Sequence, residues 1–157
     1  MTTSPTLSND RSMAVDSERD AYTVHAVRAE IEHQHARAGH VARRAVAATG
    51  WFGIALIHLL DLPSKISEAP YLGYGYIGLI VASLVLVEML LRRDDALVWG
   101  AAASLSAAVV AGFVINRTVG LPQAHGDIGN WGEPLGLASL AVEAFVLLLA
   151  LGRLVRR

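Results

Sequence analysis

Glu143 needs explanation first, because this carboxylate lies inside a long apolar stretch, residues 134–152. About nine residues precede it there, so a helix rising about 1.5 Å per residue would carry it ~13 Å deep. A lone carboxylate at that depth of a bilayer costs about 2.5–3.5 kcal/mol on insertion scales. It must therefore face protein and find a partner, or hold a proton. Two interpretations stay open: a proton or ligand site, or a neutral carboxyl that hydrogen-bonds a neighbouring helix, where Ser104 and Ser106 lie at similar depth.

A second set of polar residues lies where the apolar stretches end. His58 and Asp61 are three residues apart and so share one helical face. A carboxylate beside an imidazole can orient it as a base or as a metal ligand. We expect these two to gather with polar residues of the segments 61–70 and 116–133 on one side of the membrane, as an outward-facing group called here the outer polar cluster. Its members are His58, Asp61, Glu68, Asn116, Arg117, His125, Asp127 and Glu133.

Three interpretations of the outer polar cluster stay open. His58, Asp61, His125 and Asp127 offer the nitrogen and oxygen ligands that suit a divalent metal ion such as Zn²⁺ or Cu²⁺, although no HxxxH or HExxH spacing is present. Salt bridges could instead cap a helix bundle, for instance between Arg117 and Asp127 or Glu133. The cluster could also be a docking surface or the mouth of a small-ligand site.

Other chemistries find less support. Haem held by two histidines would need both inside the membrane at one depth, and only His58 lies in an apolar stretch. The chain has no cysteine, which excludes disulfides, thiolate metal sites and cysteine nucleophiles. A net charge of −1 implies no bulk attraction to nucleic acid. Glu88 and Arg92, four residues apart, are expected to form an interfacial ion pair.

Four nearly uncharged stretches must position these side chains: residues 46–60, 69–87, 96–116 and 134–152. About 20 apolar residues in a helix cross the roughly 30 Å hydrocarbon core of a bilayer. The pattern predicts an all-α membrane protein, an antiparallel four-transmembrane-helix bundle with an N-terminal cytoplasmic helix. The predicted parts are a disordered tail (1–20), a cytoplasmic helix leading into span one (21–44), the transmembrane domain (45–152) and a basic cytoplasmic tail (153–157).

The distribution of Lys and Arg predicts the orientation. Eight of these residues flank one set of span ends: Arg37, Arg43, Arg44, Arg92, Arg93, Arg153, Arg156 and Arg157. Two, Lys65 and Arg117, flank the other set. Because basic loops stay on the cytoplasmic side, we expect a multi-pass protein of the cell (plasma) membrane with both termini cytoplasmic.

Small residues recur every three to four positions in the spans and predict how the helices pack. The ridge of the third span consists of Gly100, Ser104, Ala108 and Gly112. That of the fourth consists of Gly132, Gly136, Ser139 and Glu143, and the second span has Gly78 and Ala82. Because small residues let helix backbones approach closely, we expect these ridges to face inward and to contact other helices.

Three short motifs also carry a resemblance. They are Glu68, Pro70 and Gly73 at the start of the second span, RTVGLP at residues 117–122, and EPLG at residues 133–136, with His58 before them and Glu143 after them. With these motifs the chain resembles uncharacterised small four-span membrane proteins of actinobacteria over residues 51–151. The resemblance implies the architecture and draws attention to the outer polar cluster, but it implies no activity.

The leading hypothesis is a small integral membrane protein, not an enzyme, that binds a small ligand, a proton or a metal ion through the outer polar cluster and Glu143. The first alternative is an accessory or structural subunit of a larger membrane complex. The second is a lipid-modifying enzyme in which Glu143 and His58 are acid and base. The expected partners are the lipid bilayer and either a larger membrane complex or further copies of the chain, with no nucleic acid.

Overall fold

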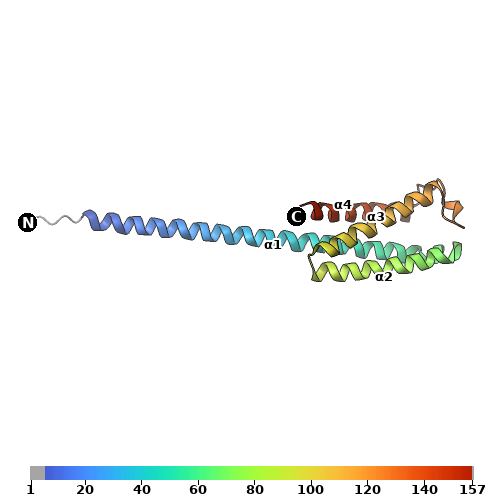
Figure 1. Ribbon diagram of the computed structural model, residues 1–157, viewed down its shortest axis with the longest axis horizontal. Helices are drawn as coiled ribbons and strands as arrows, with labels where there is room; N and C mark the ends of the chain where they lie inside the picture. The colour runs from blue at the N-terminus through green and yellow to red at the C-terminus, as the bar shows by residue number, and fades with distance from the viewer. Residues whose placement is uncertain (1–5, 157) are drawn as a thin grey trace, which may run out of the picture. The chain divides into compact units, whose positions relative to one another are not determined.

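The structure is a computed structural model that describes the backbone of residues 6–156 and the side chains of residues 23–156. The described chain is all-helical and contains no strand. Its elements in order are α1 (Thr6–Glu68), α2 (Pro70–Arg92), α3 (Ala96–Thr118), the short 3₁₀ helix η1 (His125–Asp127) and α4 (Pro134–Val155) (Figure 1). α1 begins at Thr6, inside the segment predicted as a disordered tail, and residues 1–5 lie outside the described part.

Local sequence explains where the helices begin. α2 and α4 have Pro70 and Pro134 in their first turn, where the missing N–H would have no helical partner in any case. Ala69 before the first of these prolines is extended, which separates α1 from α2. Asp95 caps α3, because its carboxylate accepts a hydrogen bond of 2.9 Å from the backbone N–H of Val98.

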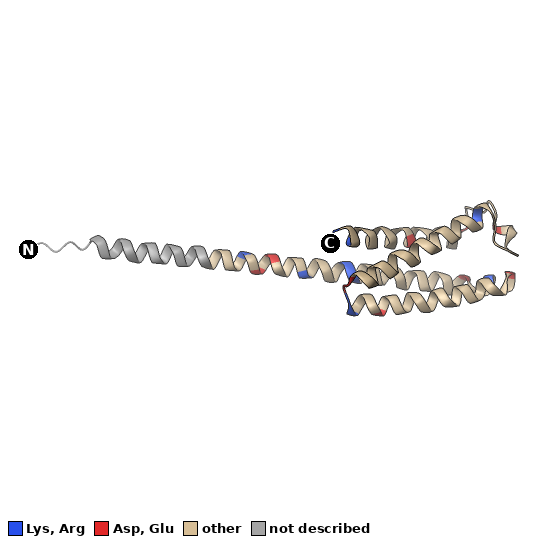
Figure 2. Ribbon diagram, in the orientation of Figure 1, with Lys and Arg blue, Asp and Glu red and all other residues tan. Residues whose placement is uncertain are grey.

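Four helices are long and apolar enough to cross a membrane: α1 from Thr23 onward, α2, α3 and α4. The last three have 23, 23 and 22 residues, or ~34 Å at about 1.5 Å per residue. Apart from Glu143 within α4, the charged side chains of these three helices lie near the helix ends (Figure 2). These observations confirm the predicted all-α chain with four helices that are long and apolar enough to cross a membrane.

The chain forms two compact units, Met1–Val41 and Ala42–Arg157. In the described part of the first unit, all side chains of residues 23–41 are exposed. The second unit contains the rest of α1 together with α2, α3, η1 and α4, and it holds both the core and the site.

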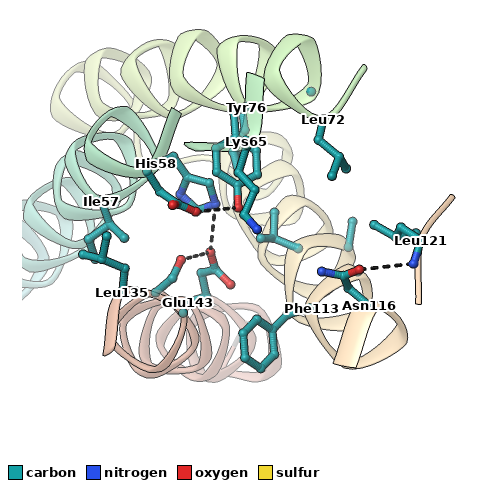
Figure 3. Close-up of a pocket in the computed structure, with 18 of the residues that line it drawn as sticks. Ile57, His58, Lys65, Leu72, Tyr76, Phe113, Asn116, Leu121, Leu135 and Glu143 are labelled. Carbon is teal, nitrogen blue, oxygen red and sulfur yellow. Dashed lines mark hydrogen bonds and ion pairs between the residues drawn. The ribbon is translucent and has the colours of Figure 1, made fainter. Parts of the chain in front are cut away.

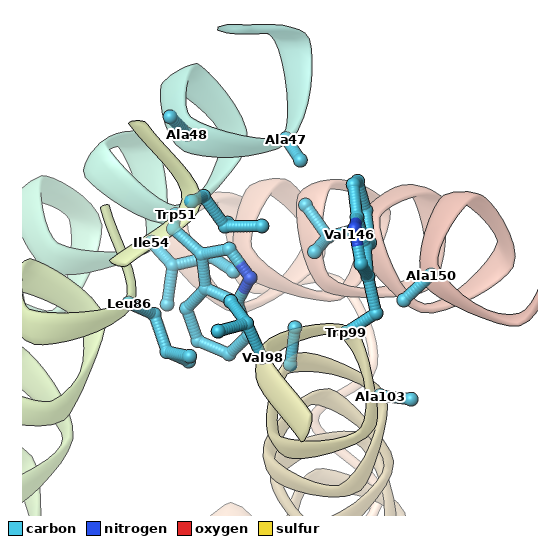
Figure 4. Close-up of a cluster of buried hydrophobic side chains, with 12 residues drawn as sticks. Ala47, Ala48, Trp51, Ile54, Leu86, Val98, Trp99, Ala103, Val146 and Ala150 are labelled. Atoms are coloured by element: carbon cyan, nitrogen blue, oxygen red, sulfur yellow. The ribbon is translucent and has the colours of Figure 1, made fainter. Parts of the chain in front are cut away.

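Tight packing occupies one half of the second unit. Trp51 of α1 and Trp99 of α3 are buried there among small and branched side chains (Figure 4). The rest of this cluster is Ala47, Ala48, Ile54, Leu86, Leu90, Val98, Ala102, Ala103, Val146 and Ala150. A Cβ atom on Gly50 would lie only 2.5 Å from Cγ2 of Val146, so this glycine permits the close approach of α1 and α4.

Polar contacts close this tightly packed end. Asp94, in the turn between α2 and α3, accepts hydrogen bonds of 2.7 Å from Nε1 of Trp99 and 3.2 Å from Nε of Arg153. Arg44 of α1 donates to the backbone carbonyl groups of Leu90 and Leu91 at the end of α2. The guanidinium groups of Arg44 on α1 and Arg153 on α4 therefore lie at the same end of the unit as the α2–α3 turn.

The ion pair predicted for Glu88 and Arg92 is present on the exposed face of α2, and this prediction is confirmed.

The small-residue ridge of α3 differs from the prediction. Ser104 and Ala108 are exposed, and a Cβ atom on Gly100 or Gly112 would meet no atom within 4 Å. The prediction that this ridge contacts another helix is therefore wrong. α3 packs along α4 and diverges from α2 beyond their shared turn (Figure 1). The small residues of α3 that are buried belong to another face: Ala102, Ala103 and Ser106.

The ridge predicted for α4 is largely correct. Ser139 and Glu143 are buried, and a Cβ atom on Gly136 would lie 2.8 Å from the Phe113 ring. Gly132 precedes the helix and is exposed. On α2, Gly78 is exposed and contacts no other helix.

Candidate functional site

Glu143 lies in the interior and contacts His58. Its side chain is 1% exposed, and Oε1 accepts a hydrogen bond of 2.6 Å from the Ser139 hydroxyl one turn earlier. Nε2 of His58, on α1, lies 3.8 Å from the same oxygen. The expected partners on α3 are not used, because Ser104 is exposed and the Ser106 hydroxyl has no hydrogen-bond partner among the described residues.

The backbone fixes the orientation of the His58 ring. Nδ1 lies 2.9 Å from the carbonyl oxygen of Ile54, and a carbonyl group can only accept, so Nδ1 carries a hydrogen. Nε2 is then the ring atom left to face Glu143, as a lone pair in neutral histidine and as a donor in the protonated form. Nε2 and Oε1 face each other at a distance too long for a direct hydrogen bond, so each atom can accept from a donor or hold a proton of its own.

Tyr76 of α2 links this pair to Asp61. Its ring meets the His58 ring edge to face at 4.8 Å between centroids, and its hydroxyl donates a hydrogen bond of 3.2 Å to Oδ2 of Asp61. A continuous polar row thus runs from Asp61 through Tyr76 and His58 to Glu143 and Ser139. Sequence analysis missed Tyr76, which carries no charge and lies among other tyrosines at the start of α2.

A cavity of about 520 Å³ lies beside this row, and all four long helices contribute to its lining (Figure 3). His58 and Glu143 line its inner part. The apolar wall includes Ile57, Leu79, Leu105, Phe113 and Leu135. Gly75, Gly78 and Ala82 of α2 and Ala108 and Gly112 of α3 also line it. The small residues predicted to join helices therefore border an open volume where α2 and α3 diverge.

Four members of the outer polar cluster border the same cavity away from His58 and Glu143: Asn116, Arg117, Asp127 and Glu133. The carboxylate of Asp127, the last residue of η1, is contacted by three nitrogen atoms: Nζ of Lys65 at 3.0 Å, Nδ2 of Asn116 at 2.7 Å and Nη1 of Arg117 at 2.7 Å. Arg117 also pairs with Glu133, while Lys65 pairs with Glu68 at 2.8 Å. These contacts match the predicted salt bridges of Arg117 with Asp127 and Glu133. Lys65 was considered in the sequence only for orientation, and its position in the network was missed.

This network controls the ionisation of Asp127, which lies outside the four candidate spans. Burial alone would raise the pKa of the Asp127 carboxyl, but hydrogen bonds from Lys65, Asn116 and Arg117 outweigh that effect and hold the pKa below its usual range. Asp127 is therefore a stable anion that fastens the loop between α3 and α4 to α1. The Tyr71 hydroxyl donates a hydrogen bond of 2.6 Å to the carbonyl oxygen of Pro122 and so holds the same loop against α2.

The four residues considered as metal ligands are not brought together. Asp127 is engaged by cations, Asp61 accepts from Tyr76, and His125 is exposed on η1. In the part of the chain with described side chains, no three His, Asp or Glu residues form a group that could hold a metal ion. The metal interpretation of His58, Asp61, His125 and Asp127 therefore loses its geometric basis.

The chain matches no protein-family profile, no curated protein and no solved structure.

The arrangement combines three chemical properties. The cavity is large enough for a small organic molecule, since typical ligand sites measure about 300–1,000 Å³. Its inner end presents two ionisable side chains that face each other, His58 and Glu143, and its outer end presents a network of fixed charges. The wall between them is mainly apolar. Such a site can bind an amphipathic molecule, and its inner end can accept a hydrogen bond or a proton.

Proposed function

We propose that this protein is a membrane-embedded binding protein, and that its cavity and Glu143 form one site for a small molecule. One observation carries the proposal: a single cavity of about 520 Å³ is lined both by the His58–Glu143 pair and by Lys65, Arg117 and Asp127. Packed Leu and Val side chains between the two ends would have separated them. Instead, the buried residues of the cluster around Trp51 and Trp99 lie outside the cavity lining.

The cost of burying Glu143 also favours a binding role. A carboxyl group kept only to join helices would bond a neighbouring helix, but Glu143 bonds Ser139 on its own helix and approaches His58 without a hydrogen bond. Intramembrane acids are expensive and typically mark ligand or proton sites. The placement of Glu143 in the cavity lining supports this interpretation.

The proposed setting is the plasma membrane of a bacterium, with α1 to α4 forming an antiparallel bundle and both termini cytoplasmic. The resemblance to actinobacterial four-span proteins suggests that source. The contacts of Arg44 and Arg153 support this orientation, because both lie at the end with the α2–α3 turn, away from Lys65 and Arg117. The cavity would then open toward the outer face, and the loop held by Asp127 would lie across it.

A photoactivatable octanol that carries a diazirine tests this binding role. With the protein in phosphatidylcholine nanodiscs, we expect light-driven labelling of cavity-lining peptides that plain octanol competes away. Ala108→Leu, which fills the cavity from α3, should abolish the competed labelling. Ala101→Leu, an equal change at an exposed position outside the cavity lining, should preserve it. Equal labelling of both variants would reject the cavity as the site.

The accessory-subunit role is the second candidate, favoured by the small exposed residues Ser104 and Ala108 on α3, which continue from the half-buried Gly100. A second membrane protein could pack there closely. Co-purification from native membranes in mild detergent tests this role. A stoichiometric partner lost on Ser104→Leu would favour it over the ligand site.

A further inference from the structure

The cationic side chains that line the cavity are already paired. Lys65 lies between Glu68 and Asp127, at 2.8 and 3.0 Å. Arg117 lies between Asp127 and Glu133 and is 3% exposed. Both belong to the outer end, and each already has two carboxylates around it. Nε of Arg117 is buried without a hydrogen-bond partner among the described residues, but both positive charges are balanced by carboxylates, so neither side chain adds net positive charge to the cavity.

The carboxylates of the polar row are not paired in this way. Among the residues with described side chains, Asp61 forms no ion pair, and its recorded hydrogen bond comes from the neutral Tyr76 hydroxyl. Glu143 accepts from the neutral Ser139 hydroxyl. The basic nitrogen recorded against its carboxylate is Nε2 of His58, at 3.8 Å, and the donor hydrogen of that ring lies on Nδ1 and bonds the carbonyl oxygen of Ile54. The cavity therefore offers negative charge and acceptor atoms that are not balanced by a fixed cation.

The gap between His58 and Glu143 has the dimensions of a donor site. Nε2 and Oε1 are 3.8 Å apart, which is too long for a direct hydrogen bond. The structure records no hydrogen bond to Nε2 from the described residues, although the His58 side chain is only 6% exposed. A donor nitrogen at the edge of this gap could lie about 2.9 Å from both atoms. An ammonium group has three such hydrogens, so it could donate to both atoms at once.

The remaining wall fits an apolar body. Leu79, Leu105, Val109, Phe113 and Leu135 line the volume between α2, α3 and α4. The small residues Gly75, Gly78 and Gly112 leave space where α2 and α3 diverge, since a Cβ atom on any of them would meet nothing within 4 Å. An alkyl chain or ring can occupy this space.

We infer that the ligand of this site is an amphipathic amine: a protonated nitrogen recognised by Asp61, His58 and Glu143, joined to an apolar body held between α2 and α3. This inference rests on the proposed function and adds the charge of the ligand. It requires that a cationic head group bind better than a neutral or anionic one on the same alkyl chain.

The test compares octylamine, octanol and octanoate as competitors of the photoactivatable octanol. The protein is held at neutral pH in nanodiscs of phosphatidylcholine, a lipid without net charge. Octylamine should compete about tenfold better than octanol, as expected for one charge-assisted hydrogen bond, and octanoate should compete worst. Asp61→Asn and Glu143→Gln should each reduce the advantage of octylamine. Glu88→Gln removes a carboxylate outside the cavity lining and should leave the advantage intact. Methylamine, which has no apolar body, should compete poorly.

The outcomes separate the inference from the function on which it rests. Equal competition by octylamine and octanol would overturn the amine assignment and leave the binding role standing. If octylamine still competes better than octanol in both Asp61→Asn and Glu143→Gln, the amine assignment is overturned too, since the ammonium group would then interact with other residues. Labelling that no competitor reduces would overturn the binding role and the amine assignment together. If octanol no longer competes in Asp61→Asn or in Glu143→Gln, that variant has lost its cavity. The amine assignment is then tested by the other variant, in which octylamine must no longer compete better than octanol.

Discussion

Nε2 of His58 lies 3.8 Å from Oε1 of Glu143, and the two side chains are only 6% and 1% exposed. The first belongs to α1 and the second to α4, so residues 85 positions apart in the chain face each other inside the protein. Their separation is too long for a direct hydrogen bond and leaves room for a bridging donor. The pair lies at the inner end of the cavity, which makes it the centre of the proposed site.

Glu143→Gln should leave folding nearly unchanged. Glutamine keeps the shape and can still accept from Ser139, so the free energy of unfolding should change by less than about 1 kcal/mol. Thermal unfolding in detergent measures this effect. A large loss of stability with unchanged ligand competition would show that Glu143 serves the fold and not the site.

Gly50→Leu should destabilise the second unit by about 1–3 kcal/mol, because the added side chain would collide with Val146. Leu148→Ala is the control, since Leu148 is 69% exposed on the outside of α4 and should matter much less. Thermal unfolding midpoints of the two variants give the comparison. Equal shifts would contradict the close approach of α1 and α4 at this glycine.

Asp127→Asn should reduce stability in a pH-dependent way. The pKa of Asp127 is lower in the folded protein than in the unfolded chain. Its stabilising effect is therefore fully present above the unfolded pKa, about 3.9, and is lost as the pH falls through the lower folded pKa. The difference in unfolding midpoint between wild type and variant should be constant at pH 6–7 and should shrink below about pH 4. A difference that grows on acidification would contradict the network around Asp127.

Cysteine substitution tests the orientation, and the chain has no cysteine of its own. His125→Cys, in the loop before α4, should react with an impermeant thiol reagent in intact cells, because that loop is expected to face outward. Arg93→Cys, exposed in the α2–α3 turn, should react only after the cells are opened. The reverse pattern would invert the topology and turn the cavity toward the cytoplasm.

The spans were predictable because they depend on local composition. A run of about 20 apolar residues is long enough to cross a bilayer as a helix, and Pro70 and Pro134 mark two helix starts. The salt bridges of Arg117 were also predictable, since a basic residue in an acidic loop has few other partners.

The cavity was not predictable, because it depends on the angle between helices. A ridge of small residues allows close packing but does not require it, and Gly112 and Ala108 border space where α3 diverges from α2. The contact of His58 with Glu143 depends on the rotation of two helices about their axes, which one sequence does not specify. The contact of Lys65 with Asp127 was not predictable for the same reason, since the two residues are 62 positions apart in the chain.

The most direct measurement is a crystal structure of the protein with octylamine that carries a bromine at the end of its chain. The account predicts a bromine anomalous peak in the cavity between α2 and α3, near Gly78 and Gly112, with the amine nitrogen within hydrogen-bond distance of Asp61 or Glu143. Soaking Ala108→Leu crystals should remove that peak. A peak on the lipid-facing surface, for instance beside Leu148, with the cavity empty, would contradict the claim that the cavity and Glu143 form one binding site.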